Sequence, residues 1–207
     1  MKETIYAIMC GQVQVGYGFI ANGFFLTAAH VITDYKPCIV YIEGLKIELS
    51  NMVPEFVGIG KNNGPISYID LAFYKIDKVK GGLCITDYIP RKNEMLESLC
   101  LRDVSTPGSK DPIYELDVVP AYSLGEAEGN YFHCKCNRDE GSSGSPLLKD
   151  NHVIGIMHGG RMVKDLIVEG FLSEEEKRAH NLEDDDKICS FLRISAFMSL
   201  IESVEKK

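Results

Sequence analysis

The sequence predicts an all-β protein of two lobes with a C-terminal helix. Short runs of β-branched and aromatic residues recur along most of the chain, and turn residues separate them at close intervals. Helical segments do not alternate with these runs, which argues against a parallel α/β sheet. The runs therefore favour an antiparallel barrel or sandwich. Apolar residues at helical spacing appear only near the end of the chain.

The first lobe is predicted over about residues 1–80. One of its runs, QVQVGYGFI, alternates polar and apolar residues, as a half-buried antiparallel strand does. The candidate strands are TIYAIMC, QVQVGYGFI, GFFLTAA, CIVYIEG, LKIELSNMV and YIDLAFYKI. The turn signals between them are Ala21-Asn22-Gly23, Glu43-Gly44 and the stretch from Gly60 to Pro65.

The second lobe is predicted over about residues 95–194, after a connection at about 78–94 that contains Gly-Gly and Pro90. Its candidate strands are MLESLCLR, PIYELDVVPAY, NYFHCKC, SPLLK, HVIGIMH and ICSFLRI. The charged segment VEGFLSEEEKRAHNLEDDDK is interpreted as an excursion with one helical turn. A closing helix is predicted over about 195–206, with Ser195 as its N-cap.

Composition and charge narrow the classes of function. The 207 residues are 45% hydrophobic and 25% charged, which is typical of one ordinary globular domain. The net charge of −8 argues against nucleic acid as a partner, because phosphate binding needs a basic face. No segment approaches the roughly 20 apolar residues of a membrane span, and the N-terminus lacks a signal-peptide pattern. We therefore expect a cytoplasmic protein without a membrane partner.

Seven cysteines are scattered through the chain, and an odd number at irregular spacing favours free thiols in a reducing compartment. Cys134 and Cys136 form a C-x-C pair, which lies on one face of a strand. They would need two further ligands, such as Cys189, His133 or His158, to hold zinc. Two small apolar residues on a strand are the favoured interpretation, and no metal or other cofactor is expected.

Three residues form a candidate site only when taken together. The stretch GSSGSP at 141–146 is either a flexible loop or a turn that holds one serine as a nucleophile. His30 follows an apolar run and two alanines, and alone it is more often a histidine at a strand end. Asp70 lies within an apolar run, and a buried carboxylate requires a hydrogen-bond donor, either a turn or a histidine N–H.

In order and context, these residues resemble the chymotrypsin-like, or trypsin-like, serine peptidases. GYGFIANGFFLTAAHVI resembles the strands that lead into T-A-A-H, and YIDLAFYKI resembles the D-[LI]-A strand. GSSGSP resembles G-x-S-G-[GS]-P, and HVIGIMHGG resembles the strand that ends in substrate-binding glycines. The resemblance implies two six-stranded antiparallel β-barrels and a serine endopeptidase. It implies a catalytic triad of His30, Asp70 and Ser143, with an oxyanion hole from the N–H groups of Gly141 and Ser143.

Departures from the family pattern bear on activation and specificity. Ser142 replaces the aspartate that secreted members pair with a new N-terminus, so the chain is closer to bacterial, organellar or viral branches without zymogen activation. Asn137 lies six residues before Ser143, near where trypsin-type enzymes keep a pocket aspartate, and the lack of that carboxylate argues against Lys or Arg specificity. His158 is displaced by one residue from the pocket histidine of glutamyl endopeptidases, so it is expected to face Asp70 and leave Met157 in the pocket.

The substrate-binding strand is implied to include Gly159 and Gly160, and the partner is a peptide or protein substrate. Arg138 and Arg161 could favour an acidic substrate, although each is more often a solvated charge. Ser142 and the displaced His158 also motivate an alternative function, a catalytically silent protease fold that binds peptides or acts as a scaffold. An esterase or acyltransferase with the same triad is a third interpretation.

Overall fold

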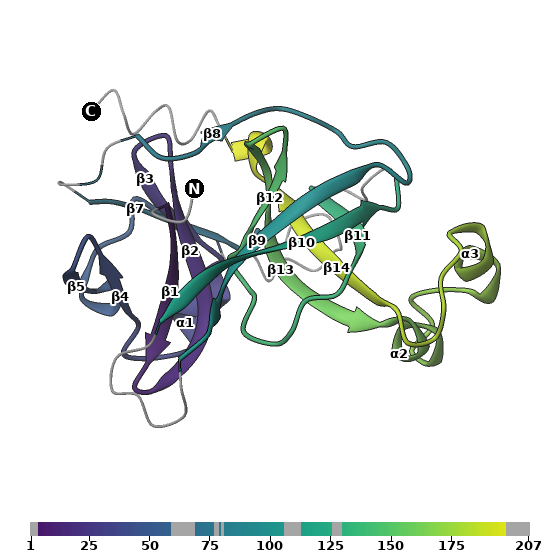
Figure 1. The fold of residues 1–207 in the computed structure, drawn as a ribbon, viewed down its shortest axis with the longest axis horizontal. Coiled ribbons are helices and arrows are strands. Elements are labelled where there is room, and N and C mark those ends of the chain that lie inside the picture. The colour runs from purple at the N-terminus through teal and green to yellow at the C-terminus, as the bar shows by residue number, and fades with distance from the viewer. Residues whose placement is uncertain are drawn as a thin grey trace.

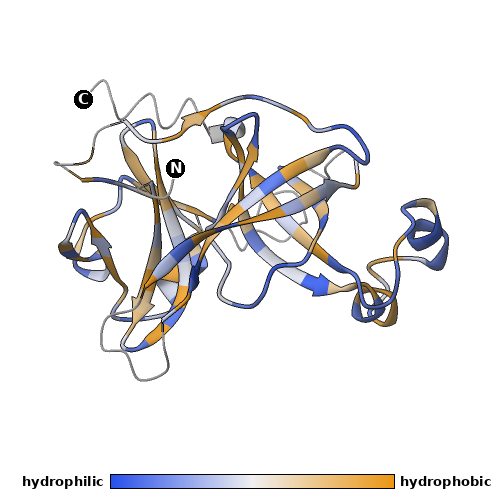
Figure 2. Cartoon of the chain, viewed as in Figure 1, coloured by the Kyte–Doolittle hydropathy of each residue, from blue (hydrophilic) through white to orange (hydrophobic). Residues whose placement is uncertain are grey.

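The computed structural model describes residues 4–58, 69–76, 79, 81–105, 113–125 and 130–197. Within them the chain forms two strongly curved antiparallel sheets that lie side by side, the first built from the N-terminal part and the second from the C-terminal part (Figure 1). Hydrophobic positions recur along the strands of both sheets (Figure 2). The structure confirms the predicted all-β fold of two lobes.

The first sheet has the strand order β5-β4-β1-β2-β3-β7-β6. Its strands are β1 (Ile5–Cys10), β2 (Val13–Ala21), β3 (Phe24–Thr27), β4 (Ile39–Ile42), β5 (Leu45–Glu48), β6 (Phe56–Gly58) and β7 (Leu71–Lys75). Helix α1 (Ala29–Asp34) follows β3, and a 3-10 turn at Leu49–Asn51 follows β5. Among the described residues β5 and β6 form the two edges, so this sheet is a half-barrel of seven strands where six in a closed barrel were predicted.

The second sheet has the strand order β12-β9-β10-β11-β14-β13-β8, and β12 also pairs with β13. That pairing closes six of the strands into a barrel, while the short β8 adds to β13 in parallel. The strands are β8 (Cys84–Ile85), β9 (Met95–Asp103), β10 (Tyr114–Ser123), β11 (Tyr131–Cys136), β12 (Pro146–Lys149), β13 (His152–Met162) and β14 (Lys187–Arg193).

One hydrophobic cluster is shared by the two lobes. It joins Phe19 and Leu71 of the first sheet to Leu148 and Leu192 of the second, and all four side chains are fully buried. The hydroxyl of Tyr17 also donates across the interface to the carbonyl oxygen of Leu101 at 2.5 Å. Because apolar burial stabilises by about 25 cal/mol per Å², this shared core holds the lobes in one arrangement.

The charged segment at 168–187, in which one helical turn was expected, contains one short helix, α3 (Glu174–Ala179). A second short helix, α2 (Val163–Val168), directly precedes it, and residues 163–186 together are called the α2–α3 excursion. Both lie at the far end of the second lobe from the first (Figure 1). Ser173 and Glu176 form a reciprocal capping box that begins α3. The predicted C-terminal helix lies mostly outside the described residues, and its described start is a 3-10 turn at Ile194–Phe197.

All seven cysteines are free thiols in the structure, and five of them are buried. Cys134 and Cys136 face the core of the second lobe, as two residues on one face of a strand should. No helix in the described part of the chain has the length and apolar character needed to span a membrane.

Candidate active site

His30 and Asp70 meet through two hydrogen bonds at the end of β3 and the start of β7, two neighbouring strands of the first sheet. His30 lies at the start of α1, directly after β3, and Asp70 directly precedes β7 instead of lying inside the strand. The backbone N–H of His30 donates to Oδ1 of Asp70 at 2.8 Å, and its ring Nδ1 lies 2.6 Å from Oδ2. With Nδ1–H directed at the carboxylate, Nε2 of His30 is left as the basic nitrogen.

Asp70 has a second imidazole partner, because Nδ1 of His158 also contacts its Oδ2. His158 is the extra residue of a bulge in β13, where Met157 pairs with Phe191 and Gly159 with Ser190. Such a bulge redirects a side chain, and here it turns the ring toward the first lobe. The predicted contact between His158 and Asp70 is confirmed.

The carboxylate of Asp70 is fully buried, and it is held ionised by these donors. Burial alone would raise its pKa, but the hydrogen bonds from His158 and His30 outweigh burial and hold the pKa well below its usual range. Asp70 therefore presents a full negative charge to both imidazoles at neutral pH. Such a charge stabilises an imidazolium at His30.

The GSSGSP segment forms a tight turn that docks against β2 of the first lobe. The N–H of Tyr17 donates to the carbonyl oxygen of Ser143 at 2.7 Å. Gly144 has a φ of +85°, and a Cβ there would lie 2.0 Å from the carbonyl oxygen of Tyr17. Only glycine fits at this position, because both the left-handed backbone and the contact exclude a side chain. This glycine-dependent turn therefore holds Ser143 against the first lobe.

The Ser143 hydroxyl points toward β13. Its Oγ donates to the carbonyl oxygen of His158 at 3.2 Å, and within the described residues it makes no hydrogen bond to His30. His158 thus contacts Asp70 through its ring and Ser143 through its backbone. The structure brings all three predicted triad residues to one site, and the direct bond between Ser143 and His30 stays a prediction that needs rotation of the serine side chain.

Comparison with known proteins identifies the fold that contains this site. No protein-family model and no curated protein sequence matches the chain. Solved structures do match: mouse neuropsin, a serine protease, has a TM-score of 0.64 at 13% identity over 98% of this chain and 94% of its own. The serine protease domain of the Sesbania mosaic virus polyprotein has 0.54 at 16%, over 83% and 94%. A scabies mite inactivated protease paralogue, SMIPP-S-I1, has 0.59 at 14%, over 99% and 95%.

This chain has the chymotrypsin-like fold. At these identities the similarity shows the fold alone. The matching structures include serine proteases as well as an inactivated protease paralogue. Whether the chymotrypsin-like fold of this chain carries out catalysis therefore depends on its own residues.

The predicted oxyanion hole lies in the turn that precedes Ser143. The N–H of Ser142 donates to the carbonyl oxygen of Asp139 at 3.3 Å, and Gly141 within this turn has a φ of +80°. Nε2 of Gln14 donates to the Gly141 carbonyl oxygen at 3.3 Å, which ties the turn to β2. In the described part of the chain neither the Gly141 N–H nor the Ser143 N–H donates to another residue, so both donors are available to a ligand.

The predicted substrate-binding residues separate into two groups. Gly159 and Gly160 line a cavity beside His158, whereas Asn137 is exposed and lines a smaller cavity of about 370 Å³ with Lys187. Met157 packs in the core of the second lobe with its side chain 2% exposed. The expectation that Met157 lines a substrate pocket therefore finds no support, because its side chain fills the barrel interior.

Arg138 is neither a solvated charge nor a contact for substrate. It is 2% exposed, and its guanidinium lies 3.0 Å from the carboxylate of Asp117 and donates to the backbone of Ser98. This anchors the segment before the nucleophile turn to β9 and β10. Arg161, in contrast, is surface-exposed and paired with Glu169 at 2.6 Å.

The space between Gly160 and the 137–138 segment is small. A Cβ on Gly160 would lie 2.9 Å from Sγ of Cys189 and 3.0 Å from Cε of Lys187. The Lys187 ammonium continues from there to the carbonyl oxygen of Arg138. These two side chains fill the side of β13 that faces Asn137.

One cluster has the composition of a metal site. His30, Asp70 and His158 offer ligand atoms within 4.8 Å of one another. The 2.6 Å separation of His30 Nδ1 and Asp70 Oδ2 is that of a hydrogen bond, since ligand atoms around tetrahedral zinc lie about 3.3 Å apart. The cysteine alternative is not assembled, because His133 lines the cavity beside His158 whereas Cys134 and Cys136 face the core.

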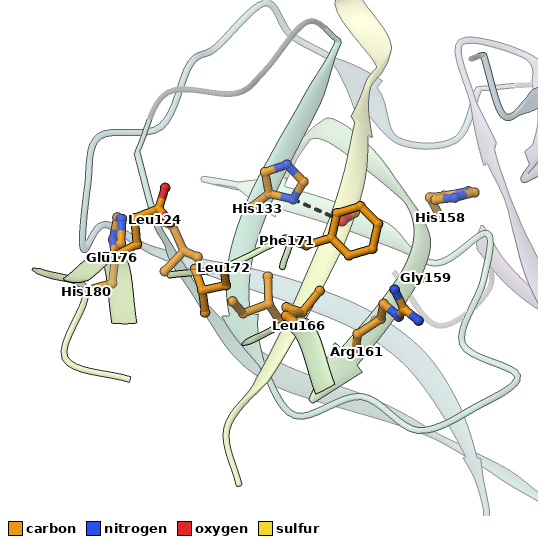
Figure 3. A pocket seen from close by; sticks show the side chains of 13 residues that line it. Leu124, His133, His158, Gly159, Arg161, Leu166, Phe171, Leu172, Glu176 and His180 are labelled. Atoms are coloured by element: carbon orange, nitrogen blue, oxygen red, sulfur yellow. Dashed lines mark hydrogen bonds between the residues drawn. The ribbon is translucent and has the colours of Figure 1, made fainter. Parts of the chain in front are cut away.

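Sequence reasoning missed the residues of the excursion that approach the site. Leu166, Phe171 and Leu172 line the cavity that begins at His158 (Figure 3). One signal was present, because Ser173 and Glu176 stand at the spacing of a capping box and mark a helix. Nothing local indicated that α2, α3 and the residues between them would line a cavity together with β13.

Proposed function

We propose that this protein is a serine endopeptidase that uses His30, Asp70 and Ser143. Oγ of Ser143 bonds to the scissile carbonyl carbon while its proton passes to Nε2 of His30. The N–H groups of Gly141 and Ser143 receive the developing oxyanion, each worth about 3–4 kcal/mol. His30 then gives the proton to the leaving amine as the C–N bond breaks. Water, deprotonated by His30, releases the acyl group from Ser143.

The observation that supports this proposal best is the double hydrogen bond between His30 and Asp70, at 2.8 and 2.6 Å. It fixes the position of the imidazole and its tautomer, which a general base requires and a structural histidine does not. The glycine-dependent turn of Ser143 lies beside the same imidazole pair. Together these features supply the nucleophile, the base and the orienting acid of one reaction.

We further propose that activity needs no cleavage of the N-terminus. Ser142 stands where an aspartate would receive a new amino group, and it is buried with no charge to offer. The turn is held instead by neutral contacts, from Gln14 to Gly141 and from Tyr17 to Ser143. Neither of these contacts involves the N-terminal amino group.

Hydrolysis of an unstructured protein tests the proposal. The purified uncleaved chain should fragment reduced, unfolded casein, and Ser143→Ala should abolish the fragmentation because no other group in the turn is placed to attack a carbonyl. Ser142→Ala is the matched control, since its side chain makes no hydrogen bond in the described residues, and it should retain activity. Peptide mapping by mass spectrometry reads out both the rate and the cleaved bonds.

A catalytically silent protease fold is the second candidate, and one observation favours it. The Ser143 hydroxyl is bonded to the His158 carbonyl oxygen and not to His30. The silent fold is the correct function if neither the wild type nor Ser143→Ala cleaves casein and both bind peptides prepared from casein.

A further inference from the structure

A cavity of about 670 Å³ lies beside the proposed active site, between the second sheet and the α2–α3 excursion (Figure 3). Strands β11, β13 and β14 supply one wall, and α2, α3 and the residues between them supply the other. The lining includes Leu124, His158, Leu166, Phe171, Leu172 and Ile188. A volume of this size accommodates more than one side chain of a peptide.

The cavity reaches His158, a residue in contact with both Asp70 and Ser143. The carbonyl oxygen of this residue accepts the Ser143 hydroxyl. Beyond Ile156, β13 pairs only with β14 among the described residues, so its other edge is open over residues 158–162. A Cβ on Gly159 would meet no atom within 4 Å, so the face of β13 is also uncovered at this residue. An extended peptide can add here as a strand.

Strand periodicity separates this cavity from the space near Asn137. Ile188 and Ser190 of β14 line the cavity, whereas Lys187 and Cys189 pack on the opposite side of β13, under Gly160. Side chains of an added strand alternate between the same two sides. If the residue directly before the scissile bond points toward Asn137, the second and fourth residues before that bond point into the cavity.

Most polar groups of the lining already have partners, and among the described residues only Nδ1 of the His180 ring is buried without a hydrogen-bond partner. Arg161 is paired with Glu169, Glu176 with the Ser173 cap, and His133 with the Ser190 hydroxyl at 3.0 Å. Burial lowers the pKa of the remaining cavity histidine, His180, and the charge of Lys92 lowers it further, so this imidazole is neutral at pH 7. A charged side chain would find no unpaired counter-charge here.

The apolar lining is only partly covered. Phe171 is 71% exposed at the mouth of the cavity, with the Arg161 guanidinium 5.8 Å from its ring centre. Leu124, Leu166 and Leu172 are half-buried around the small cluster of Val163, Leu182 and Ile188. Covering this surface with an apolar side chain removes it from water, which is the main source of binding free energy in such a cavity.

We propose that this cavity selects peptides with a bulky apolar or aromatic side chain at the second or fourth position before the scissile bond, with a small residue at the first. This inference rests on the proposed endopeptidase function. The α2–α3 excursion then selects the substrate, because Phe171, Leu166 and Leu172 contact this apolar side chain.

Equilibrium binding to the Ser143→Ala variant tests the cavity separately from catalysis. Fluorescein-labelled alanine-rich octapeptides would carry phenylalanine, alanine or aspartate at the second or fourth position, and anisotropy would give each dissociation constant. Phenylalanine at one of these positions should bind at least about tenfold tighter than alanine, from the free energy of burying its ring. Aspartate should give no gain over alanine.

Phe171→Ala should remove most of that preference without unfolding the protein, because the side chain is largely exposed. Val168→Ala is the control, since Val168 is 87% exposed on α2 and does not line the cavity. Equal binding of the phenylalanine and alanine peptides would overturn the inference, as would a phenylalanine preference that survives Phe171→Ala. Either result is independent of the casein assay, which tests the proposed function alone.

Discussion

Asp70→Asn should lower the rate of peptide hydrolysis by roughly 10⁴-fold. Oδ2 of Asp70 lies 2.6 Å from Nδ1 of His30 and also accepts from His158, so the substitution disturbs both imidazoles. In the variant, an amide nitrogen in the place of Oδ2 would donate a hydrogen bond to Nδ1 of His30. Because Nδ1 must then accept, the ring would carry its hydrogen on Nε2. In that tautomer it cannot take the proton of Ser143.

The measurement is the steady-state rate on a peptide that the wild type cleaves, with circular dichroism to confirm the fold. His158→Gln is the comparison, because it alters the second partner of Asp70 while both bonds from His30 remain, and its loss should be much smaller. A loss of only a few-fold for Asp70→Asn would show that His30 does not act as the base.

Gly144→Ala should be the most damaging small substitution in the site. The added Cβ would lie 2.0 Å from the Tyr17 carbonyl oxygen and 2.8 Å from the Thr27 hydroxyl, and the backbone φ is +85°. Strain and overpacking should together lower the free energy of unfolding by at least about 2 kcal/mol. Because the turn must move away from β2 to relieve the contact, hydrolysis should be lost as well.

Gly23→Ala separates the two causes. Gly23 has a φ of +79°, but a Cβ there meets no atom within 4 Å, so this variant carries the backbone strain without the contact. Chemical denaturation should show a smaller loss of stability for Gly23→Ala, with hydrolysis retained. Equal losses for both variants would mean that the turn of Ser143 is not docked on β2.

The strand and turn patterns predicted the two-lobed β fold, and the resemblance of four motifs to the serine peptidases supplied the triad assignment, which stays a proposal. Glycines around Ser143 mark a left-handed turn, and a carboxylate beside an apolar strand marks a buried group that needs donors. The position of His158 followed from strand parity, since one residue of displacement turns a side chain to the other face. The contact of His158 with Asp70 agrees with that prediction, and the bulge at His158, which the sequence did not indicate, also directs the ring toward the first lobe.

The sequence did not predict features that depend on packing between segments far apart in the chain. Arg138 looks like a surface charge in the sequence, and only the position of Asp117 on β10 makes it a buried anchor. Met157 looks accessible until the barrel closes over it. The cavity beside Phe171 lies between α2–α3 and strands β11, β13 and β14, an arrangement that no local pattern in the sequence indicates.

The central claim is that Ser143 is a nucleophile activated by His30. Incubation of the uncleaved chain with a fluorophosphonate, followed by intact-mass and peptide-level mass spectrometry, tests it most directly. The account predicts one phosphonyl group per chain, located on Ser143, and no adduct on Ser142 or Ser145. It also predicts that His30→Ala prevents the reaction. An unmodified wild-type chain, or an adduct on Ser143 that forms equally well in His30→Ala, would contradict the claim.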